Sequence, residues 1–183
     1  MSQSDKVPKA IIFMGIQASG KSTFFQQNFA RDFVHINLDS LHTRTKEAKL
    51  LEECLKQRAS FVVDNTNPTA GDRKRYIQAA RENGYEIEGY FFQSLVKDCI
   101  QRNSRRLGKA CVPDRAIAYT SNRLEMPAHD EGFDRLYFVC IRNGEFKVDE
   151  WKNQCLDVYK RQVYFRPPLI DKGKEHGKSI SCR

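Results

Sequence analysis

The segment that most constrains how this chain can fold is a glycine-rich turn near its start, Gly15-Ile16-Gln17-Ala18-Ser19-Gly20-Lys21-Ser22. It fits the pattern G-x-x-x-x-G-K-[ST] of a phosphate-binding loop. Residues 10–14 before it form a short apolar run typical of a buried parallel strand, and residues 23–29 after it read as a helix. This strand–loop–helix context argues against a glycine-rich turn that arose by chance.

The residue types in this turn suit the binding of a triphosphate. Gly15 and Gly20 allow the backbone to curl so that its N–H groups converge on a phosphate, and the start of the next helix adds a positive dipole. Lys21 can reach the β- and γ-phosphates of ATP, and the Ser22 hydroxyl can bind Mg²⁺. The predicted ATP contacts in this segment are Gly15, Ala18, Ser19, Gly20, Lys21, Ser22 and Thr23.

Apolar runs and helical patterns alternate along the rest of the chain. We predict strands at 33–37, 61–64, 86–92 and 136–141, and helices at 41–58, 70–83, 95–106 and 114–124. This alternation predicts an α/β protein with the P-loop NTPase or kinase fold, a largely parallel sheet of about five strands flanked by helices. A turn at 142–145 leads into 146–148, which we expect to add a short antiparallel edge strand.

The length of 183 residues suits a single domain, which we place at 1–150. Residues 151–183 form a basic extension that we expect to be partly flexible, with a mobile tail from about Asp171. This tail is either a solvated terminus or a nucleic-acid-binding arm. No apolar run is long enough to span a membrane, and the first residues lack the apolar core of a signal peptide.

The formal net charge of +8 indicates a polyanionic partner, although many small proteins are basic for solubility alone. The six cysteines are scattered, without a CxxC pair. We therefore expect reduced thiols and a cytoplasmic location, or a nuclear one if the source is eukaryotic.

Two aspartates that follow predicted strands are candidates for the chemistry. Ligands of an open α/β sheet bind at the carboxyl ends of its strands, so Asp39 can face the γ-phosphate and accept the proton of an attacking hydroxyl. The alternative is that Asp39 caps the helix predicted at 41–58. Asp64 ends an apolar run, as a Walker-B carboxylate that holds Mg²⁺ does. The polar turn 65–68 after it is also explained by Asx-turn geometry, and both interpretations can hold together.

Residues 97–109 have a net charge of +4, from one acidic residue, Asp98, and five basic ones: Lys97, Arg102, Arg105, Arg106 and Lys109. A basic helix end followed by Leu107-Gly108 suits a lid, in which an arginine can stabilise charge on a transferring phosphoryl group. The alternative is an exposed basic helix end, which the helix dipole favours.

The segments GIQASGKST, INLD, VVDNTNPT and RNSRRLGKACVP follow one another in this chain. Together they resemble the kinase domain of polynucleotide 5′-kinases of the phage and animal type, a similarity that runs over residues 10–148. The resemblance implies ATP and Mg²⁺ as cofactors, with the metal on Ser22 and Asp64. It also implies a catalytic set of Asp39 as general base, Lys21, and Arg106 on the transferred phosphate. Arg102 matches the lid arginine nearer the nucleotide and joins the ATP contacts.

The acceptor side matches this family less closely. Phage-type enzymes have an arginine three residues after the base, where this chain has His42, with Arg44 two residues further on. The predicted substrate-binding residues are His42, Arg44, Asn65, Asn67 and Arg73. The Asp-x-Asp-x-Thr/Val motif of the phosphatase domain fused to many family members does not occur in this sequence, so we expect a kinase alone.

The sequence favours an ATP-dependent kinase that transfers the γ-phosphate to the 5′-hydroxyl of DNA or RNA, with nucleic-acid 5′ ends as partners and no membrane. Two alternatives stay open. One is a P-loop kinase of a small molecule, such as a nucleoside, sugar or antibiotic, with the same ATP half. The other is a non-catalytic ATP-binding switch module, against which Asp39 and the basic lid argue.

Overall fold

The structure, a computed structural model, describes residues 7–152. The predicted extension 151–183, with the tail expected from Asp171, therefore lies almost entirely outside the described residues. Within 7–152, no helix is long and apolar enough to cross a membrane. The cysteines of that range, Cys54, Cys99, Cys111 and Cys140, are free.

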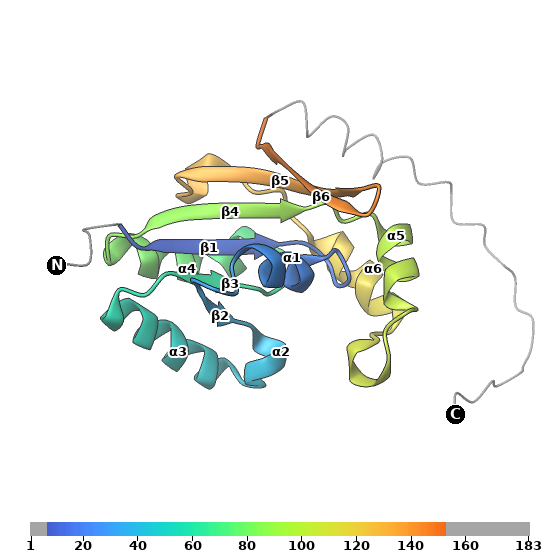
Figure 1. The fold of residues 1–183 in the computed structure, drawn as a ribbon, viewed down its shortest axis with the longest axis horizontal. Helices are drawn as coiled ribbons and strands as arrows, with labels where there is room; N and C mark the ends of the chain where they lie inside the picture. The colour runs from blue at the N-terminus through green and yellow to red at the C-terminus, as the bar shows by residue number, and fades with distance from the viewer. Residues whose placement is uncertain (1–6, 153–183) are drawn as a thin grey trace, which may run out of the picture.

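A six-stranded sheet lies at the centre of the molecule (Figure 1). Its strands are β1 (Lys9–Met14), β2 (Val34–Ile36), β3 (Phe61–Val63), β4 (Glu86–Phe92), β5 (Arg135–Arg142) and β6 (Glu145–Glu150). Their spatial order is β2-β3-β1-β4-β5-β6, and all neighbours are parallel except β5 and β6. The predicted α/β fold with a largely parallel sheet is confirmed, and β6 is the predicted antiparallel strand, longer than expected.

Helices cover both faces of this sheet. They are α1 (Lys21–Asn28), α2 (Leu38–Leu41), α3 (Arg44–Gln57), α4 (Ala70–Glu82), α5 (Val96–Asn103) and α6 (Asp114–Arg123). Alternate residues of β1 pack on opposite sides, as the two-residue period of a strand requires. Ile11 and Phe13 pack with aromatic side chains of α1, whereas Ile12 and Met14 pack with side chains of α3 and α4.

The helix predicted at 41–58 is observed as α3, which begins later than expected, at Arg44, after a break that separates it from the short helix α2. His42 has a φ of 66°, in the left-handed region that ends a helix. The Thr43 side chain then accepts a hydrogen bond from the Lys46 N–H and begins α3 as its N-cap. The helix predicted at 95–106 also ends early, at Asn103.

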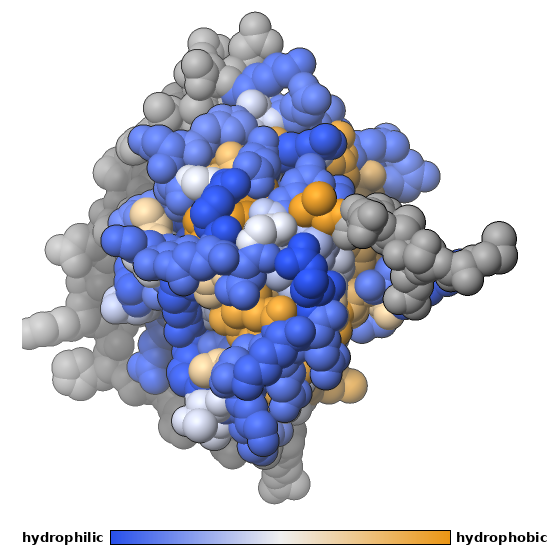
Figure 2. All heavy atoms as spheres, turned by 90° about the vertical axis from the view of Figure 1, so that its left-hand side faces the viewer, coloured by the Kyte–Doolittle hydropathy of each residue, from blue (hydrophilic) through white to orange (hydrophobic). Residues whose placement is uncertain are grey.

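The two ends of the parallel strands have different surroundings. Around their amino ends the surface is mostly hydrophilic with small hydrophobic areas (Figure 2), and ion pairs such as Arg135 Nε–Glu86 Oε1 at 3.2 Å lie there. At the carboxyl ends, the segments that follow β1, β2 and β3 contact one another. The segments that carry Ser22, Asp39 and Asp64 therefore meet at this carboxyl edge.

We predict that Gly89→Ala destabilises the fold. A Cβ on Gly89, in the middle of β4, would meet Leu136, lie 2.9 Å from Phe133 Cε1 and lie 3.0 Å from Met14 Cε, all of them buried. Overpacking of this kind costs about 1–3 kcal/mol, or roughly 2–10 °C in melting temperature for a domain of this size.

The matched control is Gly71→Ala in α4, where a Cβ meets only Thr69 Oγ1 at an ordinary 3.6 Å. Alanine is the better helix former there, so the control is expected to keep or raise the melting temperature. Equal melting temperatures for the two variants would contradict the packing described around Gly89.

Candidate active site

The glycine-rich turn connects β1 to α1 and is held from several sides. The Gly15 N–H donates to Thr66 O at 3.0 Å, which ties the turn to the segment after β3. A Cβ on Gly15 would lie 3.0 Å from Phe92 Cβ, and Gly20, the N-cap of α1, has a φ of 105°. Both positions therefore require glycine, and Ser22 and Thr23 follow in the first turn of the helix.

The Lys21 side chain folds back over this turn and is buried. Its Nζ donates to Gly15 O and to Ile16 O, each at 2.8 Å, and lies 3.3 Å from Ser19 Oγ. Burial lowers the pKa of Lys21 to about 8, although the nearby Asp64 carboxylate favours the charged form. The amine thus lies where the backbone of the turn converges.

The Asp64 carboxylate follows β3 and is 3% exposed. Its Oδ2 accepts from Ser22 Oγ at 2.7 Å and Asn37 Nδ2 at 3.2 Å, and lies 3.0 Å from His35 Nε2. The imidazole of His35 also stacks on the Phe25 ring, with centroids 3.8 Å apart. Burial disfavours the Asp64 anion, but the hydrogen bond to His35 and the charge of Lys21 outweigh it, so the pKa of Asp64 is lowered.

The other oxygen of Asp64, Oδ1, is buried and has no hydrogen-bond partner among the described residues. An acceptor without a donor in such a position suits a cation. Residues 7–152 contain no cluster of three or more His, Cys, Asp or Glu side chains that could hold a metal. Mg²⁺ needs no such cluster, because it is usually bound by one or two carboxylates together with phosphate oxygens and water. Asp64 Oδ1 and the Ser22 hydroxyl therefore fit Mg²⁺.

Asp39 lies in the first turn of α2, exposed, and its carboxylate makes no hydrogen bond or ion pair with another described residue. The alternative that Asp39 caps a helix is wrong, since Asn37 Oδ1 accepts from the Ser40 N–H and Thr43 caps α3. Its charge reaches Lys21, where it favours the protonated amine. The Asp39 carboxylate is thus unpaired among the described residues, and its charge still acts on the Lys21 amine.

The basic segment after β4 packs against the glycine-rich turn. Arg102 Nε donates to Ala18 O at 2.7 Å, which places this guanidinium at the edge of the turn. The Arg106 side chain is exposed and makes one long hydrogen bond, from Nη1 to Ala110 O at 3.4 Å. Its charge also acts on Lys21, where it lowers the pKa. The charges of Asp39, Asp64 and Arg106 therefore all act on the Lys21 amine.

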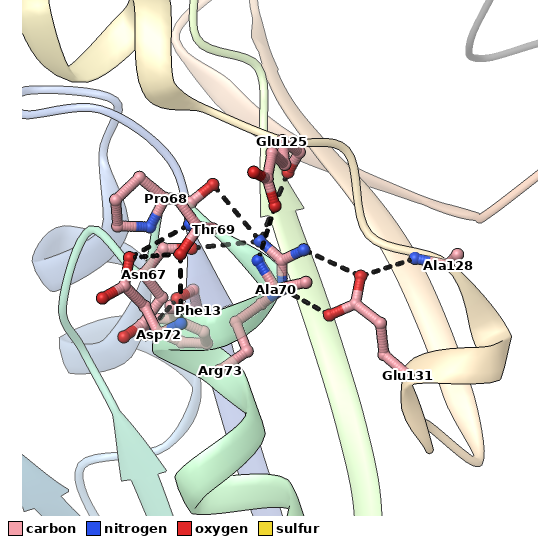
Figure 3. A network of polar contacts seen from close by, with 10 residues as sticks. All are labelled: Phe13, Asn67, Pro68, Thr69, Ala70, Asp72, Arg73, Glu125, Ala128 and Glu131. Atoms are coloured by element: carbon pink, nitrogen blue, oxygen red, sulfur yellow. Dashed lines mark hydrogen bonds and ion pairs between the residues drawn. The ribbon is translucent and has the colours of Figure 1, made fainter.

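Two predicted substrate contacts, Arg73 and Asn67, lie in the scaffold instead (Figure 3). Arg73 is 0% exposed and forms a double ion pair with Glu131, Nε–Oε2 at 2.6 Å and Nη2–Oε1 at 2.7 Å. Asn67 is buried and donates from Nδ2 to Phe13 O at 2.7 Å. The structure does not support substrate binding by either side chain, because their donors are already paired and buried.

Sequence reasoning missed a polar network centred on Glu47, which is 2% exposed. The Glu47 carboxylate accepts from Arg44 Nη1 at 2.8 Å, Asn65 Nδ2 at 2.6 Å and Tyr76 OH at 2.8 Å. Burial and the adjacent Glu47 carboxylate raise the pKa of Tyr76 to about 12, so this hydroxyl stays a donor. The Arg75 Cζ atom lies 4.4 Å from the centroid of the Tyr76 ring, and Arg75 Nη2 lies 3.5 Å from Glu47 Oε2.

This network brings two guanidinium groups to the surface near α2. The side chains of Arg44 and Arg75 are 54% and 45% exposed, and they share one carboxylate. Asn65 joins the network to α2, since its Oδ1 accepts from the Leu38 N–H at 2.9 Å, one residue before Asp39. His42, the remaining predicted substrate contact, is exposed between α2 and α3.

Comparison with known proteins places this arrangement in a family. A family model described as an AAA domain, AAA_33, matches residues 11–127. The bifunctional polynucleotide phosphatase/kinase of Schizosaccharomyces pombe is 31% identical over 148 residues, which is 77% of this chain and 36% of that protein. A putative bifunctional polynucleotide phosphatase/kinase of Acanthamoeba polyphaga mimivirus is also 31% identical, over 78% of this chain and 36% of that protein. The chain thus spans about a third of the length of these relatives.

Solved structures share the fold at low sequence identity. The AvrRxo1-ORF1:-ORF2 complex with ATP has a TM-score of 0.61 and 15% identity, covering 93% of this chain and 67% of that one. A gluconokinase from Sinorhizobium meliloti has a TM-score of 0.52 and 20% identity, covering 74% of this chain and 83% of that one. These likenesses confirm a P-loop kinase fold.

We predict that the buried Lys21 makes folding stability rise with pH. Its pKa is about 8 in the folded chain and about 10.5 when unfolded, so between these values the unfolded chain binds more protons. Relative to Lys21→Met, the free energy of unfolding of the unchanged protein should therefore increase by about 1 kcal/mol from pH 7 to pH 9. Urea denaturation at both pH values measures this difference.

Lys46→Met is the control, because it removes an exposed lysine from α3. Its stability is expected to keep a constant offset from the unchanged protein over the same pH range. If Lys21→Met behaves in the same way, the Lys21 amine is not buried as described.

Proposed function

The chain belongs to the AAA_33 family of AAA domains, and from this premise we propose that it is an ATP-dependent kinase of nucleic-acid 5′ ends. It transfers the γ-phosphate of ATP to the 5′-hydroxyl of a DNA or RNA strand. The observation that carries this proposal is the exposed, unpaired carboxylate of Asp39 near Lys21, at the carboxyl edge of the sheet. A module that only binds ATP has no use for such a carboxylate.

The phosphates of ATP bind at the turn between β1 and α1. The N–H groups of this turn and the Lys21 amine hold the β- and γ-phosphates, and a bound phosphate gives the buried amine the partner that restores its charge. Ser22 and Asp64 Oδ1 hold Mg²⁺, which neutralises charge on the phosphate oxygens when bound. Arg102 borders the nucleotide, and Arg106 offsets charge on the transferring group.

Asp39 serves as the general base. Its carboxylate accepts the proton of the acceptor hydroxyl as the oxygen of that hydroxyl attacks the γ-phosphorus. The bond from this phosphorus to the bridging oxygen breaks, and ADP leaves with the electron pair. Phosphoryl transfer needs positioning more than covalent chemistry, and the Asn65 side chain supplies positioning by holding the backbone before Asp39.

The acceptor strand enters beside α2. Arg44 and Arg75 present two half-exposed guanidinium groups held by one carboxylate, an arrangement that suits a phosphate. His42 lies between this pair and Asp39 in the sequence and is exposed. The names of the two relatives, polynucleotide phosphatase/kinases, and the net charge of +8 support a polynucleotide over a small neutral acceptor.

We predict that Asp39→Ala lowers turnover by about 10²–10⁴-fold while ATP still binds, because a general base contributes a factor of that size. The measurement is transfer of labelled γ-phosphate from ATP to 5′-hydroxyl oligonucleotides of DNA and RNA, with ATP affinity measured by calorimetry. Asp32→Ala is the control, since the Asp32 side chain is 76% exposed and lies just before the amino end of β2, at the opposite edge of the sheet from Asp39.

Two results would count against the proposal. Unchanged turnover in Asp39→Ala would remove the base. Absence of label on any oligonucleotide, in a protein that binds ATP and phosphorylates a nucleoside or sugar, would instead establish a small-molecule kinase with the same ATP half.

We also predict that the Arg44→Gln and Arg75→Gln double variant binds the oligonucleotide more weakly and with less salt dependence. Each lost phosphate contact reduces the slope of log affinity against log salt by about 0.7 for a single strand. Arg135→Gln is the control, because this 60% exposed arginine lies at the start of β5, on the opposite edge of the sheet. A salt slope in the double variant equal to that of the control would exclude this pair from the acceptor site.

A further inference from the structure

The outer side of α6 carries Arg115, Tyr119 and Arg123 at intervals of four residues, and all three side chains are exposed. We infer that this row, called the α6 row below, binds unpaired nucleotides of a single-stranded DNA or RNA acceptor. The inference rests on the proposed function and specifies its substrate class: a strand that continues unpaired beyond the residue that is phosphorylated.

Tyr119 is the least expected member of the α6 row. It is 63% exposed, and among residues 7–152 every other Phe, Tyr or Trp side chain is at least partly buried. The Arg123 guanidinium lies 5.8 Å from the centroid of its ring. An exposed tyrosine ring contributes little to the core and is available for an external contact, and tyrosine is enriched at such contacts because one end is apolar and the other polar.

The inner side of the same helix contacts the phosphate-binding turn. Ile117 is buried with Ile16 and Ala18 of the turn. Thr120 Oγ1 accepts from Gln17 Nε2 at 3.0 Å. The α6 row therefore lies about one helix diameter, roughly 10 Å, from the turn that binds the phosphates. Figure 1 shows α6 beside α5 at the carboxyl end of the sheet, on the same side as α2.

The surroundings of the α6 row are positively charged. Residues 95–127, which include α5 and α6, contain seven Lys or Arg and three Asp or Glu, a net charge of +4. On α6 itself there is one acidic residue, Asp114, and there are two basic ones, Arg115 and Arg123. This charge attracts a polyanion and gives no reason for a neutral or basic partner.

The residue types of the α6 row match the chemistry of a single strand. Proteins that bind unpaired nucleic acid combine a positively charged surface, which follows the backbone, with aromatic rings on which bases stack. Residues four apart lie about 6 Å apart along a helix, so Tyr119 has one arginine a turn before it and one a turn after it. A base stacked on the free face of the Tyr119 ring would leave its flanking phosphates to Arg115 and Arg123.

The test measures binding of fluorescently labelled dT and rU strands of twelve nucleotides to the full chain, by polarisation. Stacking of one base contributes about 1–3 kcal/mol, so Tyr119→Ala should weaken binding by about 5- to 150-fold. Tyr119→Phe keeps the ring and should bind nearly as the unchanged protein does. The dT and rU measurements distinguish DNA from RNA as the preferred strand.

Arg115→Gln and Arg123→Gln should each lower the salt slope by about 0.7. Arg31→Gln is the matched control, because Arg31 is 94% exposed and lies just past the far end of α1, away from the phosphate-binding turn. It should leave both affinity and salt slope unchanged.

The outcomes separate this inference from the proposed function. If the unchanged protein phosphorylates the strands but Tyr119→Ala binds them as tightly, the inference is wrong and the proposed function stands. An equal loss of affinity for a blunt duplex also overturns the inference, since paired bases cannot stack on Tyr119. If the unchanged protein neither binds nor phosphorylates any strand, the proposed function is wrong and the inference falls with it.

Discussion

The hydrogen bonds to one oxygen of Asp64 are the interaction on which the candidate site depends. Ser22, His35 and Asn37 come from the segments after β1, in β2 and after β2, and all three converge on Oδ2. This convergence is possible because β1, β3 and β2 are adjacent and parallel, which brings their carboxyl ends to one edge. Since Oδ2 takes all three contacts, Oδ1 stays without a partner, and the carboxylate has a fixed direction.

A second buried charge fixes the frame around this edge. The double ion pair of Arg73 and Glu131 is expensive to desolvate, and it is tolerated because Arg73 also donates to the backbone at Asn67 and Glu125. These contacts join the turn after β3 to α4 and to the segment after α6 (Figure 3). Arg106 contrasts with this frame, since its side chain is exposed and makes one long hydrogen bond, to Ala110 O in the same loop. The site therefore combines a buried, hydrogen-bonded frame around Arg73 with an exposed Arg106 side chain that makes few contacts.

Local signals made much of this fold predictable. The glycine-rich turn, the apolar strands and the capping box, in which Thr69 and Asp72 bond each other, are set by residues close in sequence. The break between α2 and α3 was missed because a left-handed histidine is uncommon, although Thr43 was an available cap signal. Arg73 could not be distinguished from a surface arginine, because its partner Glu131 lies 58 residues further along the chain.

The Glu47 network illustrates the same limit and also shows how the two halves of the site are related. From the sequence, a glutamate in a polar helix is expected to be exposed to solvent. Glu47 is buried because Asn65 and Tyr76, from distant segments, donate hydrogen bonds to its carboxylate. Through Asn65, the backbone before Asp39 is bonded to the carboxylate that holds Arg44. One amide side chain therefore relates the position of Asp39 to that of the Arg44 guanidinium. If Asp39 and Arg44 act as proposed, an acceptor has to carry its charge and its hydroxyl at the separation of these two residues, which is a geometric criterion for substrate choice.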